Sequence, residues 1–278
     1  TSSGNISSSG YITANNITSS GNISASGTII ANSISSSNSN FSGTISASNI
    51  SASGWISGSD LVITNNSILG NTSNLDNVRI FDASWHLPNS NRCGLNEFKK
   101  AHIKNANFFD IDKNSNQNSN LPHMLQKKND WEKIVSEYGV KNSDHVVIYD
   151  NSDVISSCRV WYNFLYFNHN PDLISVLDGG LKKWIIKKEK TTTVLKKFKE
   201  SAYKAKLNSN LVLDKNQILS NIKSKSFELV DARNKERFLG SQPEPRKDLK
   251  SGNIKGPKNL PFTTLINKGD RTFKNKED

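Results

Sequence analysis

The sequence predicts an α/β protein with a largely parallel sheet, preceded by a β-rich repeat, and three observations support this class. From residue 76 onward, short apolar strands alternate with helical segments, which is typical of a parallel sheet covered by helices. In residues 1–75, isoleucines recur at regular intervals among Ser, Gly, Asn and Thr. The composition also changes abruptly between these parts. Asp60 is the only charged residue of the first 75, so every Lys and Arg behind the net charge of +11 lies in residues 76–278.

The first part contains a sequence repeat whose units begin at Gly10, Gly27 and Gly43. Each unit carries three large apolar residues at regular intervals. This spacing predicts a Ser/Gly/Asn/Ile-rich, β-solenoid-like repeat with three faces per coil. Because one apolar residue per face cannot bury itself, the coils must stack or the chains must trimerise. A flexible linker is the alternative. The apolar positions are Ile12, Ile17 and Ile23, then Ile29, Ile34 and Phe41, then Ile45, Ile50 and Ile56.

This first part resembles the shaft repeats of bacteriophage tail fibres and other viral structural proteins. We expect no acid, base or nucleophile chemistry from residues 1–75 and assign them a fibre-like or linker role. A natural fusion to the rest of the chain and a joining of unrelated reading frames both remain open. If the repeat forms a fibre, the virion is the expected location.

The overall composition excludes several classes of protein. The lysines are scattered and are not interleaved with aromatic residues, which favours a solvated surface over a nucleic-acid interface. No segment has the ~20 apolar residues that a membrane span requires, and no signal peptide is recognisable. Two cysteines, Cys93 and Cys158, are too few for a disulfide framework or a zinc site. We therefore expect a cytoplasmic protein that needs no metal and no cofactor.

Residues 76–190 form a first α/β unit in which strands and helices alternate. We expect strands at 77–82, 106–112, 145–149 and 173–177, with a short polar segment at 97–102. Helical spacing covers 131–138, where Trp131, Ile134, Val135 and Tyr138 share one side, and further helices are expected at 157–167 and up to Trp184.

Several motifs in this unit occur together and in order: SWHLP at 84–88, AHIKNANFFDID at 101–112, HML at 123–125, HVVIYD at 145–150, RVWYNF at 159–164 and LDGGLKKW at 177–184. With them the chain resembles the two-domain rhodanese-type sulfurtransferases, above all the 3-mercaptopyruvate sulfurtransferases. The resemblance implies tandem α/β rhodanese domains. It assigns 76–190 to a non-catalytic first domain, 191–211 to a linker and 212–278 to an incomplete second domain.

The resemblance also implies roles for two residues of the first domain, Asp112 and His123. They match positions that the family brings to the domain interface to assist proton transfer or orientation. A carboxylate can fix the tautomer of an imidazole and support it as a base. Asp150 occupies the place where the sister domain holds its nucleophile. We therefore interpret Cys158, in the first turn of a helix, and Cys93, in a loop, as structural rather than reactive.

The segment 230–262 carries arginines beside a Pro-Glu-Pro corner and is suited to bind a small anion. Arg237 and Arg246 match the arginines that bind the substrate carboxylate in the family, and a guanidinium offers such an anion two parallel hydrogen bonds. We expect Asp214 to be the N-cap of a helix within 211–222 and residues 227–230 to form a strand. Arg233 is expected to tie the end of this strand to the loop. A solvated basic loop is the alternative for all three arginines. Asn253 stands where the family usually has His.

The mechanism implied is a double displacement. A cysteine thiolate takes sulfur from 3-mercaptopyruvate or thiosulfate and passes it to cyanide or a thiol. The family holds this cysteine in a CGSGVT-type loop, which is not found in these 278 residues. We therefore expect a C-terminally truncated enzyme that forms no persulfide. The alternative is a fibre-like structural protein that carries a rhodanese-like module.

Overall fold

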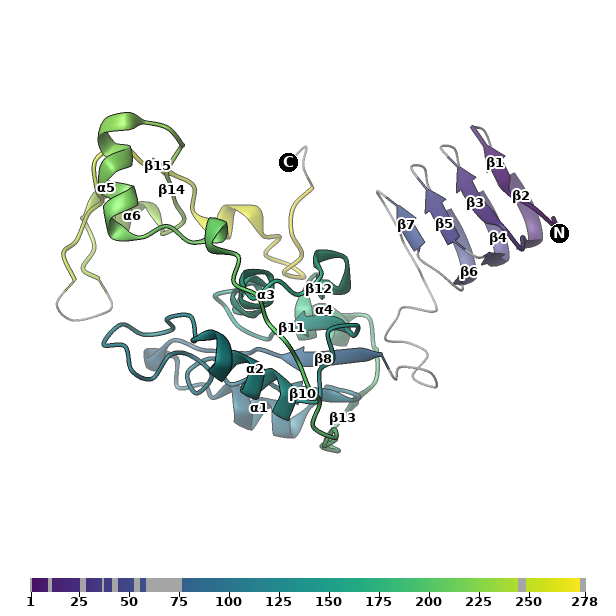
Figure 1. The fold of residues 1–278 in the computed structure, drawn as a ribbon, viewed down its shortest axis with the longest axis horizontal. Helices are drawn as coiled ribbons and strands as arrows, with labels where there is room; N and C mark the ends of the chain where they lie inside the picture. The colour runs from purple at the N-terminus through teal and green to yellow at the C-terminus, as the bar shows by residue number, and fades with distance from the viewer. Residues whose placement is uncertain are drawn as a thin grey trace. The chain divides into compact units, whose positions relative to one another are not determined.

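The computed structural model describes residues 2–9, 12–25, 29–36, 38–41, 45–52, 56–58, 77–244 and 249–275. The chain forms two compact units, Thr1–Asp76 and Asn77–Asp278, which Figure 1 shows as a set of short strands and an α/β body. Within the described residues, no helix is long and apolar enough to cross a lipid bilayer.

The strands of the first unit pair in parallel to form two sheets. Partners in neighbouring strands lie one sequence repeat apart: Ile12 pairs with Ile29, and Ile29 with Ile45. The register therefore equals the period of the sequence. One sheet contains β1 (Ile6–Ser8), β3 (Asn22–Ala25), β5 (Asn38–Phe41) and β7 (Ile56–Gly58), and the other contains β2 (Ile12–Thr18), β4 (Ile29–Ser36) and β6 (Ile45–Ala52).

The prediction of a three-faced solenoid is not supported, because the described strands form two sheets and not three faces. The reason is the length of the strands. Strand β2 is long enough to contain both Ile12 and Ile17, so two apolar positions of one unit share a strand. The third position of that unit, Ile23, lies on β3 in the other sheet and is buried. The glycines that begin the units, Gly10, Gly27 and Gly43, and also Asp60, lie outside the described residues.

Four parallel strands form the central sheet of the second unit, in the order β10-β8-β11-β12. Each of the four predicted strands is present, although the one predicted at 106–112 ends at Phe108. The strands are β8 (Val78–Asp82), β10 (Ala106–Phe108), β11 (His145–Tyr149) and β12 (Ile174–Val176), and the connecting helices are α1 (Gly94–Lys100), α2 (Lys128–Glu137), α3 (Ser157–Tyr166) and α4 (Gly180–Ile186).

One face of this sheet packs against α2 and α3. Phe81 of β8 and Val146 and Ile148 of β11 belong to the same buried cluster as Trp131 of α2 and Phe164 of α3. The rings of Trp131 and Phe164 meet edge to face, with centroids 5.1 Å apart. The predicted apolar side of the helix around Trp131 is therefore a core-facing side.

The predicted polar segment at 97–102 and the predicted linker at 191–211 are more ordered than expected. Residues 97–102 belong to α1 and to β9 (His102–Ile103), because Phe98 is buried and anchors the helix. The predicted linker begins with β13 (Thr191–Thr192), which pairs antiparallel with β9. It also buries Tyr203 in the core cluster of the α/β unit. Short 3-10 helices lie at η2 (Pro88–Ser90), η3 (Pro171–Leu173) and η4 (Ser209–Leu211).

The remaining part contains fewer regular elements. Helix α5 (Lys215–Ser224) begins at the predicted N-cap, Asp214. The strand predicted at 227–230 is reduced to β14 (Val230–Asp231), which pairs in parallel with β15 (Lys258–Asn259). Helix α6 (Lys235–Leu239) was not predicted, and η5 (Phe262–Leu265) precedes the final segment.

Candidate functional site

Asp112 and His123 are brought into direct contact by the loops that follow β10. The Nε2 atom of His123 lies 2.6 Å from Oδ1 of Asp112. The His123 side chain is 21% exposed and that of Asp112 is 67% exposed, so the pair is accessible to small molecules. A carboxylate in this position orients the ring and leaves Nδ1 as the imidazole atom available to a ligand.

Trp85, from the predicted SWHLP motif, holds the pair from the side. Its indole Nε1 donates a hydrogen bond of 2.9 Å to Oδ2 of Asp112. Its ring also meets the imidazole of His123 edge to face, with centroids 4.9 Å apart. Both partners of the pair are thus fixed by one side chain. The sequence contained Trp85 in a motif, but nothing in the pattern assigned it this contact.

Arg159 supports the backbone of His123. His123 has a φ of 57°, a left-handed conformation that is unusual for a residue with a side chain. The Nη2 atom of Arg159, on α3, donates a hydrogen bond to the carbonyl oxygen of His123. The Nε atom of Arg159 is buried and has no hydrogen-bond partner among the described residues. A half-buried cation therefore contacts the backbone of His123.

The loop after β11 is filled by a carboxylate of the chain itself. Asp150 accepts hydrogen bonds from the backbone N–H groups of Ser152, at 2.9 Å, and of Ser157, at 2.7 Å. Ser157 begins α3, where unpaired N–H groups favour negative charge. The carboxylate of Asp150 therefore lies where the N–H groups of this loop favour an anion.

The two cysteines have different surroundings, and those of Cys158 are consistent with a packing role rather than a reactive one. Cys158 lies in the first turn of α3 as predicted, and burial, followed by the charge of Asp150, raises the pKa of its thiol to about 11. Such a thiol is protonated at neutral pH and is a poor nucleophile. Cys93 is exposed and precedes α1.

Two of the predicted arginines, Arg233 and Arg237, bind the carboxylate of Glu244. Arg237 lies on α6, and its Nε donates to Oε2 of Glu244 at 3.1 Å. Arg233 donates to Oε1 of the same carboxylate at 2.7 Å. The Glu244 side chain is only 3% exposed, and its bonds to the arginines lower its pKa. The sequence showed Glu244 only as part of a Pro-Glu-Pro corner and did not identify it as the shared partner.

Arg233 has the predicted structural contacts. It binds Asp231, at the end of β14, with Nη2 2.6 Å from Oδ2, and it donates to the carbonyl oxygen of Gly252 at 2.9 Å. Asn253, where the family usually has His, donates to the carbonyl oxygen of Phe238 at 2.9 Å. Arg246 lies outside the described residues. Among the residues that are described, no hydrogen bond or ion pair joins Arg237 to Asp112 or to His123.

A third contact joins the last described segment to the loop after β11. The Nη1 atom of Arg271 lies 2.8 Å from Oδ1 of Asp153, and its Nη2 donates to the carbonyl oxygen of Ser152. The backbone N–H of Phe273 donates to Asp178 at 2.8 Å. In the described part of the chain, no three His, Cys, Asp or Glu side chains are grouped so that they could hold a metal ion.

Comparison with known proteins relates this architecture to one group. Residues 71–187 match the model of the rhodanese-like domain. The chain is 37% identical over 191 residues to the 3-mercaptopyruvate sulfurtransferase of Mus musculus, a match that covers 68% of this chain and 64% of the relative. It is 34% identical over 210 residues to thiosulfate/3-mercaptopyruvate sulfurtransferase 1, mitochondrial, of Arabidopsis thaliana, which covers 68% of this chain and 55% of the relative.

The structural comparison agrees with the sequence comparison. The crystal structure of SseA from Escherichia coli superposes with a TM-score of 0.65 and 27% identity, covering 73% of this chain and 74% of SseA. The α/β part therefore has the rhodanese fold, and its relatives at about 35% identity are sulfurtransferases. The chain spans between 55% and 64% of the length of the two curated relatives given above.

Proposed function

We propose that this chain acts in sulfur transfer and binds a small anionic donor, 3-mercaptopyruvate or thiosulfate, whose sulfur passes to cyanide or a thiol. The observation that carries the proposal is the His123–Asp112 contact of 2.6 Å, which occurs within a rhodanese fold and is braced by Trp85. A solvent-accessible imidazole fixed by a carboxylate is suited to move a proton to or from a bound thiol.

In this proposal each candidate residue has one task. Asp112 fixes the imidazole of His123, and His123 exchanges a proton with the donor or the acceptor. Arg237 and Arg246 bind the carboxylate or the oxyanion of the donor, because a guanidinium stays charged at any working pH. A second arginine suits the carboxylate of 3-mercaptopyruvate.

The corresponding domain assignment is also part of the proposal. Residues 76–190 are the first, non-catalytic rhodanese domain, 191–211 are the linker, and 212–278 belong to the second domain. The thiolate that accepts sulfur is supplied by neither cysteine of this sequence. The pKa of Cys158 is raised by burial. Among the described residues, the hydrogen bonds of the His123 and Arg237 side chains do not involve Cys93.

Donor binding tests this assignment directly. Isothermal titration calorimetry with 3-mercaptopyruvate should give saturable binding that weakens at least about tenfold in Arg237→Ala, since a charge-assisted bond to a carboxylate is lost. Lys235→Ala, on the same helix, is the matched control and should bind normally. Equal affinity in Arg237→Ala and in the unmodified protein would remove Arg237 from the site.

Sulfur labelling tests the assignment of the cysteines. Incubation with thiosulfate that carries radioactive sulfane sulfur should leave the chain unlabelled. Label that persists after gel filtration and disappears on treatment with cyanide would contradict the proposal. Single Cys93→Ser and Cys158→Ser variants would then identify the cysteine that had been modified.

A second candidate function concerns the first unit alone. Its parallel strands, paired at an offset of one sequence repeat, favour a structural role, and we propose that residues 1–75 form part of a fibre-like assembly that includes more than one chain. Sedimentation equilibrium should then show an oligomer for the full chain and a smaller species after removal of residues 1–75. An identical oligomeric state for both proteins would contradict this role.

A further inference from the structure

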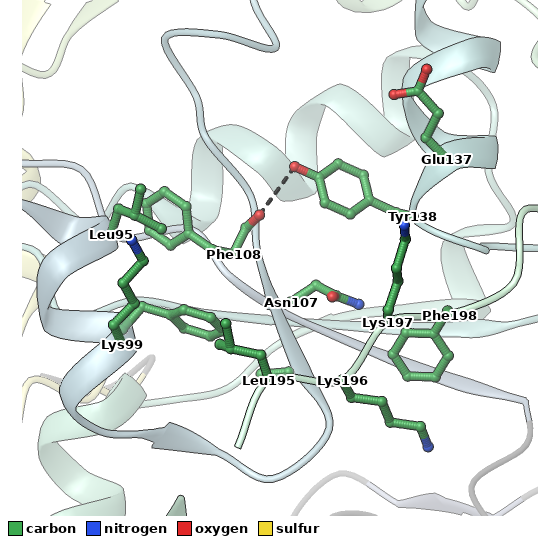
Figure 2. Close-up of a pocket in the computed structure, with 12 residues that line it drawn as sticks. Leu95, Lys99, Asn107, Phe108, Glu137, Tyr138, Leu195, Lys196, Lys197 and Phe198 are labelled. Atoms are coloured by element: carbon green, nitrogen blue, oxygen red, sulfur yellow. Dashed lines mark hydrogen bonds between the residues drawn. The ribbon is translucent and has the colours of Figure 1, made fainter. Parts of the chain in front are cut away.

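A separate pocket of about 390 Å³ lies on the first α/β unit. Its walls come from α1, from β10, from the end of α2 and from residues 195–198 of the segment after β13, which Figure 2 shows converging on one space. None of Asp112, His123 or Arg237 lines it. A volume of this size lies within the range of small-molecule sites in proteins.

The walls of this pocket are mainly apolar. Phe98 from α1 is buried, and Phe108 from β10 lies beside it with ring centroids 5.7 Å apart. Leu95, Leu195 and Phe198 complete the apolar lining. Leu195 remains 60% exposed, so the chain itself does not cover this side of the pocket. Such walls favour a ligand with a hydrocarbon or aromatic body.

The Tyr138 hydroxyl of the wall is already used within the protein. The hydroxyl of Tyr138 donates to the carbonyl oxygen of Phe108 at 3.0 Å, the bond drawn in Figure 2, and accepts from Asn114 at 3.1 Å. A neutral polar ligand would therefore gain little by hydrogen bonding to these groups, since each protein bond would have to be replaced.

The charge around the pocket is positive. Three lysines line it, Lys99, Lys196 and Lys197, against a single carboxylate, Glu137. No ion pair involves these lysines within the described part of the chain. The Nζ atom of Lys196 lies 4.8 Å from the ring centroid of Phe198, which places this cation directly beside the apolar wall.

We propose that this pocket binds an amphipathic organic anion, with its aliphatic or aromatic body against the phenylalanines and its carboxylate or sulfonate beside Lys196 and Lys197. The apolar walls and the lysines restrict the ligand in different ways. Inorganic anions would leave the apolar walls unused, and neutral lipids would leave the lysines unused. A fatty carboxylate of medium length satisfies both.

Calorimetric titration with decanoate tests the proposal on the full chain. Decanoate should bind in a saturable manner, whereas decanol and acetate should bind at least about tenfold more weakly. The double variant Lys196→Glu/Lys197→Glu should weaken decanoate binding about tenfold, because two attractive charges at an exposed site are replaced by repulsive ones. The matched control, Lys187→Glu/Lys190→Glu, reverses two exposed lysines that do not line the pocket and should bind like the unmodified protein.

The apolar wall is tested by a substitution that does not threaten the fold. Leu195→Ser changes a side chain that is largely exposed, so the circular dichroism spectrum should be unchanged while decanoate binding weakens. Two results would overturn the proposal: decanol that binds as tightly as decanoate, or decanoate affinity that is the same in the double lysine variant and in its control. Since His123 and Arg237 do not line the pocket, these results are independent of the sulfur-transfer proposal.

Discussion

At the scale of single residues, Asp82 is a carboxyl group that the fold buries at the end of β8. Its Oδ1 accepts the backbone N–H of Ser84 at 2.9 Å, and Tyr149 and Asp150 are its neighbours on the adjoining strand end. Burial is the largest influence and raises the pKa of Asp82 to about 6. The protein must therefore ionise a buried acid as the pH rises through this value.

This predicts that Asp82 makes the protein less stable at neutral pH than at mildly acidic pH. The native state keeps the proton up to about pH 6, whereas the unfolded chain releases it near 3.8, so the free energy of unfolding should fall between these values. Relative to Asp82→Asn, the loss should be on the order of 3 kcal/mol. Urea unfolding of both proteins at several pH values measures it. Parallel curves for the two proteins would contradict the prediction.

Cys158 allows a second prediction at this scale. Because its pKa is raised to about 11, only on the order of one molecule in a thousand carries a thiolate at pH 8. Iodoacetamide should therefore modify the exposed Cys93 much faster than Cys158, as read by mass spectrometry of the two peptides. In denaturant both cysteines should react, which serves as the control. Equal rates in the native protein would disprove the burial argument.

The sequence suggested candidate residues but not their contacts. Asp112 and His123 were named because the motifs in which they lie resemble those of the rhodanese-type sulfurtransferases. Trp85 and Glu244 could not, since an indole N–H or a carboxylate acquires its role only from the side chains that folding places beside it. The Glu244 carboxylate accepts hydrogen bonds from two arginines of its own segment of the chain, and no periodicity in the sequence indicates that arrangement.

At the scale of elements, helix α5 shows how local signals determine a helix start. Asp214 accepts the N–H of Gln217 at 2.8 Å, and the Gln217 side chain accepts the N–H of Asp214 at 2.7 Å, a reciprocal capping box. This start was predicted because Asp before a helical pattern is a purely local signal.

The capping box predicts a measurable loss on substitution. Asp214→Ala should destabilise α5 by about 1 kcal/mol, whereas Asp214→Ser should cost much less because its hydroxyl can still accept the Gln217 N–H. Amide hydrogen exchange of residues 215–224 measures the change, with α2 as the internal reference. Unchanged exchange in Asp214→Ala would show that tertiary packing, and not the cap, holds this helix.

Elements that depend on distant contacts were predicted less well. Helix α1 was taken for a polar segment because it contains only two large apolar residues, Leu95 and Phe98, and the burial of Phe98 depends on the sheet. Strand β14 is shorter than predicted for the opposite reason. Its apolar run was clear in the sequence, but Phe227 and Val230 remain exposed. Among the described residues, β14 pairs with β15 in a sheet of two strands.

At the scale of the whole molecule, Arg271 connects the final segment to the first α/β sheet. It binds Asp153 at 2.8 Å and the carbonyl oxygen of Ser152, both in the loop after β11. Thr272, next to it, is buried. Residues that are far apart in the sequence are thus held together by a few polar contacts.

We predict that Asp153→Asn loosens this connection without altering the local backbone of the final segment. Peptides that cover residues 262–275 should exchange amide hydrogens several-fold faster, because the charge-assisted bond to Arg271 is weakened. Arg271→Gln should have the same effect, and Lys274→Ala should have none. Protection that is unaffected in both Asp153→Asn and Arg271→Gln would show that Thr272 and its neighbours hold the segment alone.

The pairing offset in the first unit has a consequence for how this part of the chain can change in length. Because each strand pairs with the strand one repeat further along, a gain or loss of one whole repeat moves entire strand pairs and leaves every remaining partner in register. The offset is 17 residues between Ile12 and Ile29 and 16 residues between Ile29 and Ile45, so a difference of one residue between units also leaves these positions paired. The length of this part can therefore change by whole repeats while the remaining strand pairs keep their register.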